Sequence, residues 1–164
     1  MLFIGNTYKV GNEPHRTYDE VWNIMRFPTK GLRMEMDWHV ELAPSRELFF
    51  DYKTLKDRNL WTKELFEDWY VPRYIEEIKH NGKAKKALNY LYLNSIQKDI
   101  ILCCSCYDEE LCHRWIVKNL VLETYVRRGI LPEGIRPPKT TYYNMYLSKE
   151  SLLLTKDSKG NIQR

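Results

Sequence analysis

The sequence predicts an α/β protein, a single Rossmann-like domain in which helices flank a mainly parallel sheet. The apolar run at 99–104 lacks polar alternation, which is typical of a strand covered on both faces. The segment after it repeats apolar residues at helical spacing and stops at Gly129, behind two arginines. A buried strand followed by such a helix is half of a βαβ unit, which predicts the parallel sheet.

Two further strands are expected before this one. Residues 1–5 suit a first strand, and Gly5, Asn6 and Thr7 form a turn after it, where the backbone can approach a ligand. Residues 21–25 suit either a strand or a helix. We interpret them as a strand, because Arg26-Phe27-Pro28 ends the segment before a helix develops.

Helices are expected in the remaining segments. Residues 31–60 are interpreted as mostly loop, with a short helix capped by Ser45. Residues 61–80 suit a helix that Pro72 kinks or divides, and a third helix spans about 83–95. Asp108 is the expected N-cap of the helix that follows the buried strand.

Length and charge predict the domain organisation. With 164 residues, of which 43% are hydrophobic, the chain is long enough for one core, and we assign the α/β domain to 1–134. Residues 135–164 form a C-terminal extension with six Lys or Arg and two Asp or Glu, so the whole net charge of +4 lies there. The sequence sets no oligomeric state.

The extension carries aromatic and apolar segments. Residues 140–147 are β-prone, and 151–162 resemble a small hairpin. The tyrosines of the first segment either stack on the bases of a single strand or pack on the body of the protein, and we favour packing: Tyr142, Tyr143 and Tyr146.

The candidate catalytic site lies between the buried strand and the next helix. There Cys104, Cys112, His113 and Arg114 supply thiols, an imidazole and a guanidinium within eleven residues. Ligands of such sheets bind beyond the carboxyl ends of the strands, and helix N-termini attract anions. Taken singly, a cysteine or histidine here is more often a packing residue. The combination favours a site with a cysteine nucleophile, an imidazole acid or base, and a guanidinium that binds phosphate or carboxylate.

All four cysteines lie between 103 and 112, which predicts reduced thiols rather than disulfides between distant segments. Zinc is the alternative use of these thiols. The spacing of Cys104 and Cys106 is tighter than the usual zinc spacing, and Cys112 and His113 project about 100° apart on a helix. We therefore expect no metal and no other cofactor.

No apolar run approaches membrane-spanning length, and the first five residues are too short for a signal-peptide core. We therefore expect a cytoplasmic protein without a membrane partner.

Five separated elements, in this order and spacing, resemble the bacterial and phage family numbered 488 among the domains of unknown function. They are Ile4-Gly5, Arg26-Phe27-Pro28, Leu42-Ala43-Pro44-Ser45, an aromatic-rich segment at 61–74, and Cys104 to Arg114. The resemblance covers about 1–128 and implies an α/β domain with a mainly parallel sheet, but no particular reaction.

The resemblance also bears on the site. It adds Arg26, Pro28, Pro44 and Ser45 to the candidate binding residues, beside the turn at Gly5, Asn6 and Thr7. Relatives often carry Glu where this chain has Cys106, so a general base supplied by that Glu would be missing here.

Two classes of function fit these observations. The first is an enzyme acting on a nucleotide or nucleic acid, with Cys112 or Cys104 as nucleophile, for which Cys112→Ser should abolish turnover without unfolding the protein. The second is a non-catalytic protein that senses a phosphorylated ligand, docks on nucleic acid through the extension, or binds a host partner as a phage accessory protein. We favour the first class, or nucleotide binding in the same pocket.

Overall fold

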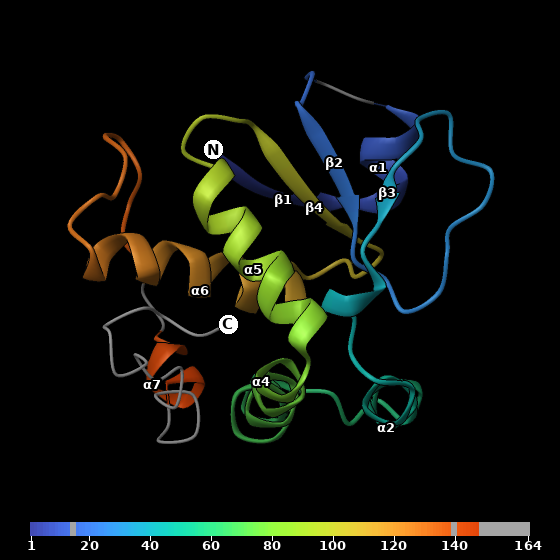
Figure 1. The fold of residues 1–164 in the computed structure, drawn as a ribbon. Coiled ribbons are helices and arrows are strands. Elements are labelled where there is room, and N and C mark those ends of the chain that lie inside the picture. The colour runs from blue at the N-terminus through green and yellow to red at the C-terminus, as the bar shows by residue number, and fades with distance from the viewer. Residues whose placement is uncertain (14–15, 139–140, 148–164) are drawn as a thin grey trace.

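The sheet is parallel, as the sequence predicts, and it has a fourth strand at 37–38, within the segment interpreted as mostly loop. The computed structural model describes residues 1–13, 16–138 and 141–147. In these residues the strands are β1 (Leu2–Asn6), β2 (Glu20–Asn23), β3 (Asp37–Trp38) and β4 (Ile100–Cys104), in the spatial order β1-β4-β2-β3 (Figure 1). Since β4 is central, its carboxyl end meets those of β1 and β2 at one edge. The Rossmann-like α/β fold is therefore confirmed.

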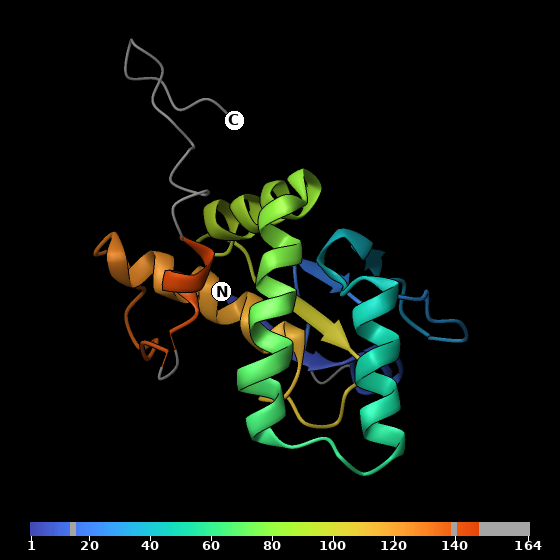
Figure 2. The ribbon, with the colours of Figure 1, turned by 90° about the horizontal axis from the view of Figure 1, so that it is seen from below.

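The remaining elements are helical. In chain order they are α1 (Thr7–Asn12), the 3-10 turn η1 (Val40–Leu42), α2 (Arg46–Asp57), α3 (Lys63–Leu65), the π-helical segment η2 (Phe66–Tyr70), α4 (Val71–His80), α5 (Gly82–Asn94), α6 (His113–Arg127) and α7 (Tyr143–Tyr146). Figure 1 and Figure 2 show α2 and α4 lying side by side, both on the same side of the sheet. None of the helices in the described ranges is long and apolar enough to cross a membrane.

The core lies on one face of the sheet. Leu2, Ile4, Ile100 and Leu102 alternate along β1 and β4 and pack on this face together with Trp22. Every residue of β4 is buried, as expected for the central strand of a parallel sheet. By the same alternation Cys104 points to the core face and Cys103 to the opposite one.

Helix α2 is longer than the short helix expected within the predicted 31–60 loop. Ser45 caps it as predicted, because its Oγ accepts the backbone N–H of Leu48. The Ser45 N–H and hydroxyl both donate to Glu77 on α4, which fixes the start of α2 against that helix. The interpretation of this segment as mostly loop was wrong, because α2 spans twelve of its residues. The length of the helix was missed because its apolar pattern is weak, and only Leu48 of α2 is fully buried.

The helical segment at 61–80 is divided near Pro72, as predicted. Pro72 lies in the first turn of α4, and the π-helical turns of η2 precede it directly. A widened segment before a proline accommodates its ring and its missing N–H donor.

Helix α6 begins four residues later than predicted, because its N-cap is Cys112 rather than Asp108. The Asp108 carboxylate accepts the N–H of Glu110 and stabilises a local turn, so it does not cap the helix. Cys112 takes the N-cap position instead, with extended backbone angles (φ −134°, ψ 148°). The predicted stop is confirmed, because α6 ends at Arg127 and Gly129 has φ +67°.

The described part of the C-terminal extension packs on the body. Tyr142 is fully buried, and its N–H donates to the Glu123 carboxylate on α6. Tyr143 and Tyr146 pack against the same core from α7, so the favoured packing interpretation holds and the β-prone one was wrong. The predicted hairpin at 151–162 lies outside the described residues.

Candidate active site

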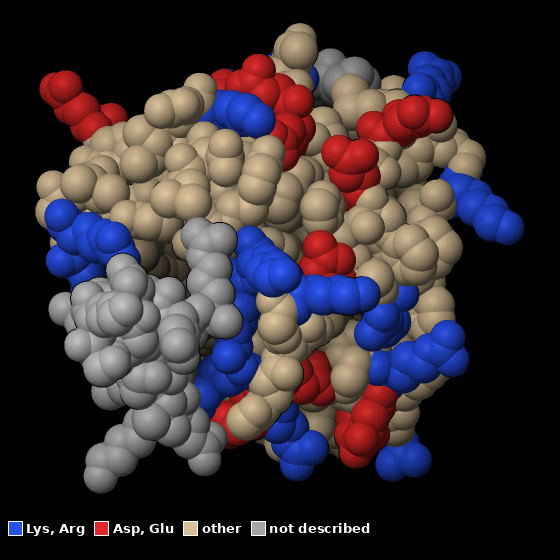
Figure 3. Space-filling model, viewed as in Figure 1, with Lys and Arg blue, Asp and Glu red and all other residues tan. Residues whose placement is uncertain are grey.

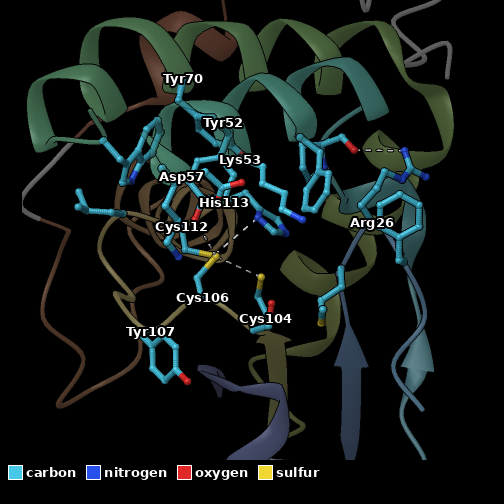
Figure 4. Close-up of a pocket in the computed structure, with 18 residues that line it drawn as sticks. Arg26, Tyr52, Lys53, Asp57, Tyr70, Cys104, Cys106, Tyr107, Cys112 and His113 are labelled. Carbon is cyan, nitrogen blue, oxygen red and sulfur yellow. Dashed lines mark hydrogen bonds between the residues drawn. The ribbon is translucent and has the colours of Figure 1, made fainter. Parts of the chain in front are cut away.

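A cavity of about 290 Å³ opens at the carboxyl ends of β2 and β4, beneath α2 and η2 (Figure 4). This is where ligands bind in parallel α/β sheets. Its lining combines sulfur, aromatic and charged side chains: Met25, Arg26, Phe27, Pro44, Phe49, Tyr52, Lys53, Lys56, Asp57, Trp61, Tyr70, Cys104, Ser105, Cys106, Tyr107, Leu111, Cys112 and His113.

Three cysteine sulfurs form the floor of the cavity. The Sγ atoms of Cys104 and Cys106 lie 3.7 Å apart, and those of Cys104, Cys106 and Cys112 all lie within 4.8 Å of one another. The first two residues alternate along extended chain, which turns both side chains to one side. The third is the N-cap of α6. We call these three side chains the sulfur cluster; Figure 4 shows the thiols of Cys104 and Cys106 directed toward each other.

The pKa values of the three thiols are shifted in different directions. Hydrogen bonds from the Cys104 and Cys112 thiols lower the pKa of Cys106 well below its usual range. The hydrogen bond to Cys106 raises the pKa of Cys104, and burial raises that of Cys112. Cys106 is also the only one of the three that is not fully buried. It is therefore the sulfur that a ligand in the cavity can reach.

His113 is buried and neutral. Burial lowers its pKa, and its Nε2 lies 2.8 Å from the carbonyl oxygen of Ile24. Because a carbonyl only accepts, the proton is on Nε2. The Nδ1 lone pair then faces the Cys112 Sγ at 3.6 Å, which makes His113 an acceptor beside the sulfur cluster.

Arg114 is fully buried and does not line the cavity. Its Nη1 donates to the carbonyl oxygens of Gly5 and of Cys104 (2.8 Å), and its Nη2 donates to that of Cys106 (2.9 Å). The guanidinium therefore joins the ends of β1 and β4 to the loop that carries Cys106. Among the described residues, the carboxylate within 4.0 Å of the guanidinium is that of Glu109, at 3.9 Å.

Aromatic rings form one wall of the cavity. The ring centroids of Tyr52 and Trp61 lie 4.7 Å apart in an edge-on arrangement, and Tyr70 lies 6.0 Å from Tyr52. Phe27 and Phe49 form a second edge-on pair, at 5.4 Å, on the side of β2. Rings on two sides make this an apolar slot of the kind that takes a flat ligand.

Three cations line the same cavity with a single carboxylate. Lys53, Lys56 and Asp57 come from the last turns of α2, and the Arg26 Nη1 donates to the carbonyl oxygen of Pro44 at 3.2 Å. On the face of the molecule in Figure 3, basic and acidic side chains are interspersed. Within the cavity, three cations against one carboxylate leave an excess of positive charge.

The structure separates the candidate residues into two groups. Cys104, Cys112, His113, Arg26 and Pro44 line the cavity. The others lie outside it: Gly5, Asn6, Thr7, Pro28, Ser45 and Arg114.

Several residues of the second group have positions that stabilise the site. Asn6 belongs to β1, caps α1, and donates to the carbonyl oxygen of Ser105 at 3.2 Å, so the expected turn at Gly5 is a strand end instead. A Cβ on Gly5 would lie 2.8 Å from a Val10 methyl group. The buried Thr7 hydroxyl donates to the Met25 sulfur.

Sequence reasoning missed most of the aromatic and cationic lining. Tyr52, Lys53, Lys56 and Asp57 lie on α2, which was interpreted as mostly loop. Cys106 was interpreted as a poorly spaced zinc ligand and as the replacement of a Glu that relatives often carry, and not as part of the candidate site. Its alternation with Cys104 at the end of a strand is the signal that places both on one side.

A second, shallower and wider hollow lies over β2, β3 and α5. It is lined by Glu20, Trp22, Asp37, Trp38, His39, Glu41, Lys83, Lys86, Ala87 and Tyr90. The indole of Trp22 stacks on His39 with ring centroids 3.6 Å apart, so this apolar surface is already covered within the protein.

Comparison with known proteins gives one match. A family model described as the active DUF488-N3 subclade, DUF488-N3a, matches residues 6–125, well over half of the chain. These residues include all the lining side chains of the cavity. No curated protein and no solved structure matches.

Proposed function

Because the chain belongs to the DUF488 family, we propose that the cavity is the active site of an enzyme that acts on a nucleotide, free or within a nucleic acid. The observation that carries this proposal is the combination of aromatic walls, basic side chains and a reactive floor in one cavity. The description of the matched subclade as active favours a catalytic protein over a binding module.

The aromatic walls suit a nucleobase. Every base has a flat π-face, and stacking on a side-chain ring contributes about 1–3 kcal/mol per base. Tyr52 and Trp61 offer such faces, and Lys56 lies over the Tyr52 ring at 5.8 Å. The volume of about 290 Å³ is at the lower end of small-molecule sites, which favours a single nucleotide unit over a dinucleotide.

The basic side chains suit the phosphate. Lys53 and Lys56 are exposed and free to approach an anion, whereas Arg26 is half-buried and oriented by its bond to Pro44. With one carboxylate against three cations, the lining favours a ligand that carries negative charge.

The floor supplies the chemistry. A nucleotide between the aromatic walls places its sugar or base edge toward Cys106, the accessible member of the sulfur cluster. His113 and Tyr52 stand beside this cluster, with the Tyr52 hydroxyl 3.9 Å from the Cys106 Sγ. Arg114 acts as a positioning residue, because it holds the loop of Cys106 through backbone carbonyls.

Calorimetric titration of nucleoside 5′-monophosphates and of the matching nucleosides tests the binding step. We expect the monophosphate to bind at least about tenfold more tightly than the nucleoside, with an affinity that falls as salt rises. Lys53→Ala with Lys56→Ala should remove this difference. Lys83→Ala is the matched control, because Lys83 is exposed on α5 outside the cavity. Equal affinities for nucleoside and nucleotide would contradict the proposal.

Chromatography of the incubated nucleotides tests the catalytic step. We expect conversion of at least one of them or of a short single-stranded oligonucleotide, and its loss in Cys106→Ala with binding retained. Tight binding without conversion of any of these ligands would contradict the enzymatic part of the proposal.

A further inference from the structure

The sulfur cluster has the geometry of a metal site. In tetrahedral zinc–thiolate centres the Zn–S distance is about 2.3 Å, which places the sulfurs about 3.8 Å apart. The Cys104 and Cys106 sulfurs lie 3.7 Å apart, and every pair in the cluster is within 4.8 Å. A side-chain rotation that moves Cys112 Sγ inward by about an ångström therefore completes a set of three ligands.

The backbone explains why an unusual spacing can provide this set. Cys104 ends β4 and Cys106 follows two residues later, so the alternation of extended chain directs both thiols to one side. Cys112 has extended backbone angles at the N-cap of α6, so the angular argument for two consecutive helical residues does not apply to it. The third thiol comes from a separate element, the start of α6, and completes the set of three ligands.

Charge favours an anionic centre at this place. Arg114 is a fully buried cation, its Nε has no hydrogen-bond partner among the described residues, and Glu109 reaches it only at 3.9 Å from a half-exposed position. A buried charge needs a counter-charge nearby. Three thiolates around a divalent ion carry a net charge of −1, and Arg114 is bonded to the backbone of two of the three cysteines.

The outer shell is also present. The Tyr52 hydroxyl faces the Cys106 sulfur at 3.9 Å and can donate to a thiolate there. The backbone carbonyls of Cys104 and Cys106 are fixed by Arg114, and Asn6 holds the loop between them. Such partners orient metal ligands and maintain affinity.

We propose that Cys104, Cys106 and Cys112 bind one zinc ion as thiolates, with the fourth coordination position directed into the cavity. Each cysteine that is still protonated releases its thiol proton to solvent as its Zn–S bond forms. Thiolates select zinc among the divalent ions that prefer tetrahedral sites. All three cysteines line the cavity, so a ligand or water there can take the fourth position. The binding of zinc rests on this sulfur geometry alone, whereas its use on a nucleotide rests on the proposed function.

Elemental analysis and native mass spectrometry of the full chain, purified with reductant and exposed to zinc, test the proposal. We expect one zinc ion per chain. Cys103→Ala is the matched control, because Cys103 is buried in the same strand but points to the other face of the sheet, and it should retain the ion. Cys106→Ser and Cys112→Ser should bind zinc at least about 100-fold more weakly, since loss of an outer-shell partner alone costs 10- to 100-fold.

Cobalt(II) titration tests the metal site in the wild-type chain, so the result does not depend on whether the cysteine variants fold. We expect the intensity of the thiolate-to-cobalt band to correspond to three sulfurs, and the visible bands to shift when azide is added to the open position. A chain that takes up no zinc, or variants that retain it like the wild type, would overturn the metal site. A cobalt spectrum that azide leaves unchanged would overturn the open position.

The two proposals fail separately. Zinc bound by a protein that binds no nucleotide overturns the proposed function and leaves the metal site in place. Nucleotide binding by a chain that takes up no zinc overturns the metal site and leaves the proposed function in place.

Discussion

Replacing Arg114 by methionine tests the structural account of the site most severely. The guanidinium donates to three carbonyl oxygens, at the ends of β1 and β4 and in the loop that carries Cys106. Methionine fills similar apolar space but offers no donor, so the buried acceptors lose their partner.

The expected loss follows from these contacts. Hydrogen bonds from a charged group contribute roughly 1.5–3 kcal/mol each, and each buried carbonyl left without its donor costs about 1–3 kcal/mol. Asn6 still donates to the Cys106 carbonyl, at 3.5 Å, which lessens the total. With three carbonyls affected, we therefore expect Arg114→Met to lower the free energy of unfolding by about 3–5 kcal/mol.

Urea unfolding followed by tryptophan fluorescence measures this loss. Arg33→Met is the control, because Arg33 is exposed in the loop before β3, and it should stay within about 0.5 kcal/mol of the wild type. Arg114→Lys should fall between the two, since a single ammonium group does not reach all three acceptors. A loss below about 1 kcal/mol in Arg114→Met would refute the reasoning, because the carbonyls would then have found other donors.

Three further predictions concern other parts of the chain. Gly5→Ala should cost about 1–3 kcal/mol in urea unfolding, because its Cβ would lie 2.8 Å from Val10 and 2.9 Å from Ile101; an unchanged midpoint would contradict this packing. Although burial alone would raise it, hydrogen bonds from Lys98, Tyr90 and Trp22 lower the pKa of Glu20, so its contribution to stability is present above pH 4.5 and lost as the pH falls through the lowered pKa. The melting temperature of Glu20→Gln should therefore lie below that of the wild type at pH 7 and approach it in acid, and a difference that persists in acid would contradict the assignment. Deletion of 148–164 should leave the affinity for nucleoside monophosphates unchanged by calorimetry, because the cavity is built from residues 25–113; weaker binding would assign the extension a part in the site.

The sequence predicts the sheet because its signals are local. The apolar run predicts β4, and the breaks at Pro28 and Gly129 predict that β2 and α6 end before them. All three elements are present in the folded protein. Cys104, Cys112 and His113 could be grouped because they lie within ten residues of one another, across one strand-to-helix junction. For these parts, short-range patterns carry the information.

The rest depends on contacts between distant segments. Helix α2 is polar along most of its surface, and its place against α4 is set by Ser45 and Glu77, 32 residues apart. No local sequence pattern predicts this contact. The position of Tyr52 and Lys53 over the sulfur cluster therefore could not be predicted. Arg114 was predicted to bind an anion from its residue type, whereas its guanidinium donates to the carbonyl oxygen of Gly5, 109 residues away in the sequence.

The most direct test of the central claim is a crystal structure of the protein with a nucleoside 5′-monophosphate. The account predicts the base against Tyr52 and Trp61, the phosphate near Lys53 and Lys56, and the remaining part of the ligand over Cys106. A nucleotide bound in the hollow beside Trp22 and His39, with the cavity above the cysteines empty, would contradict it.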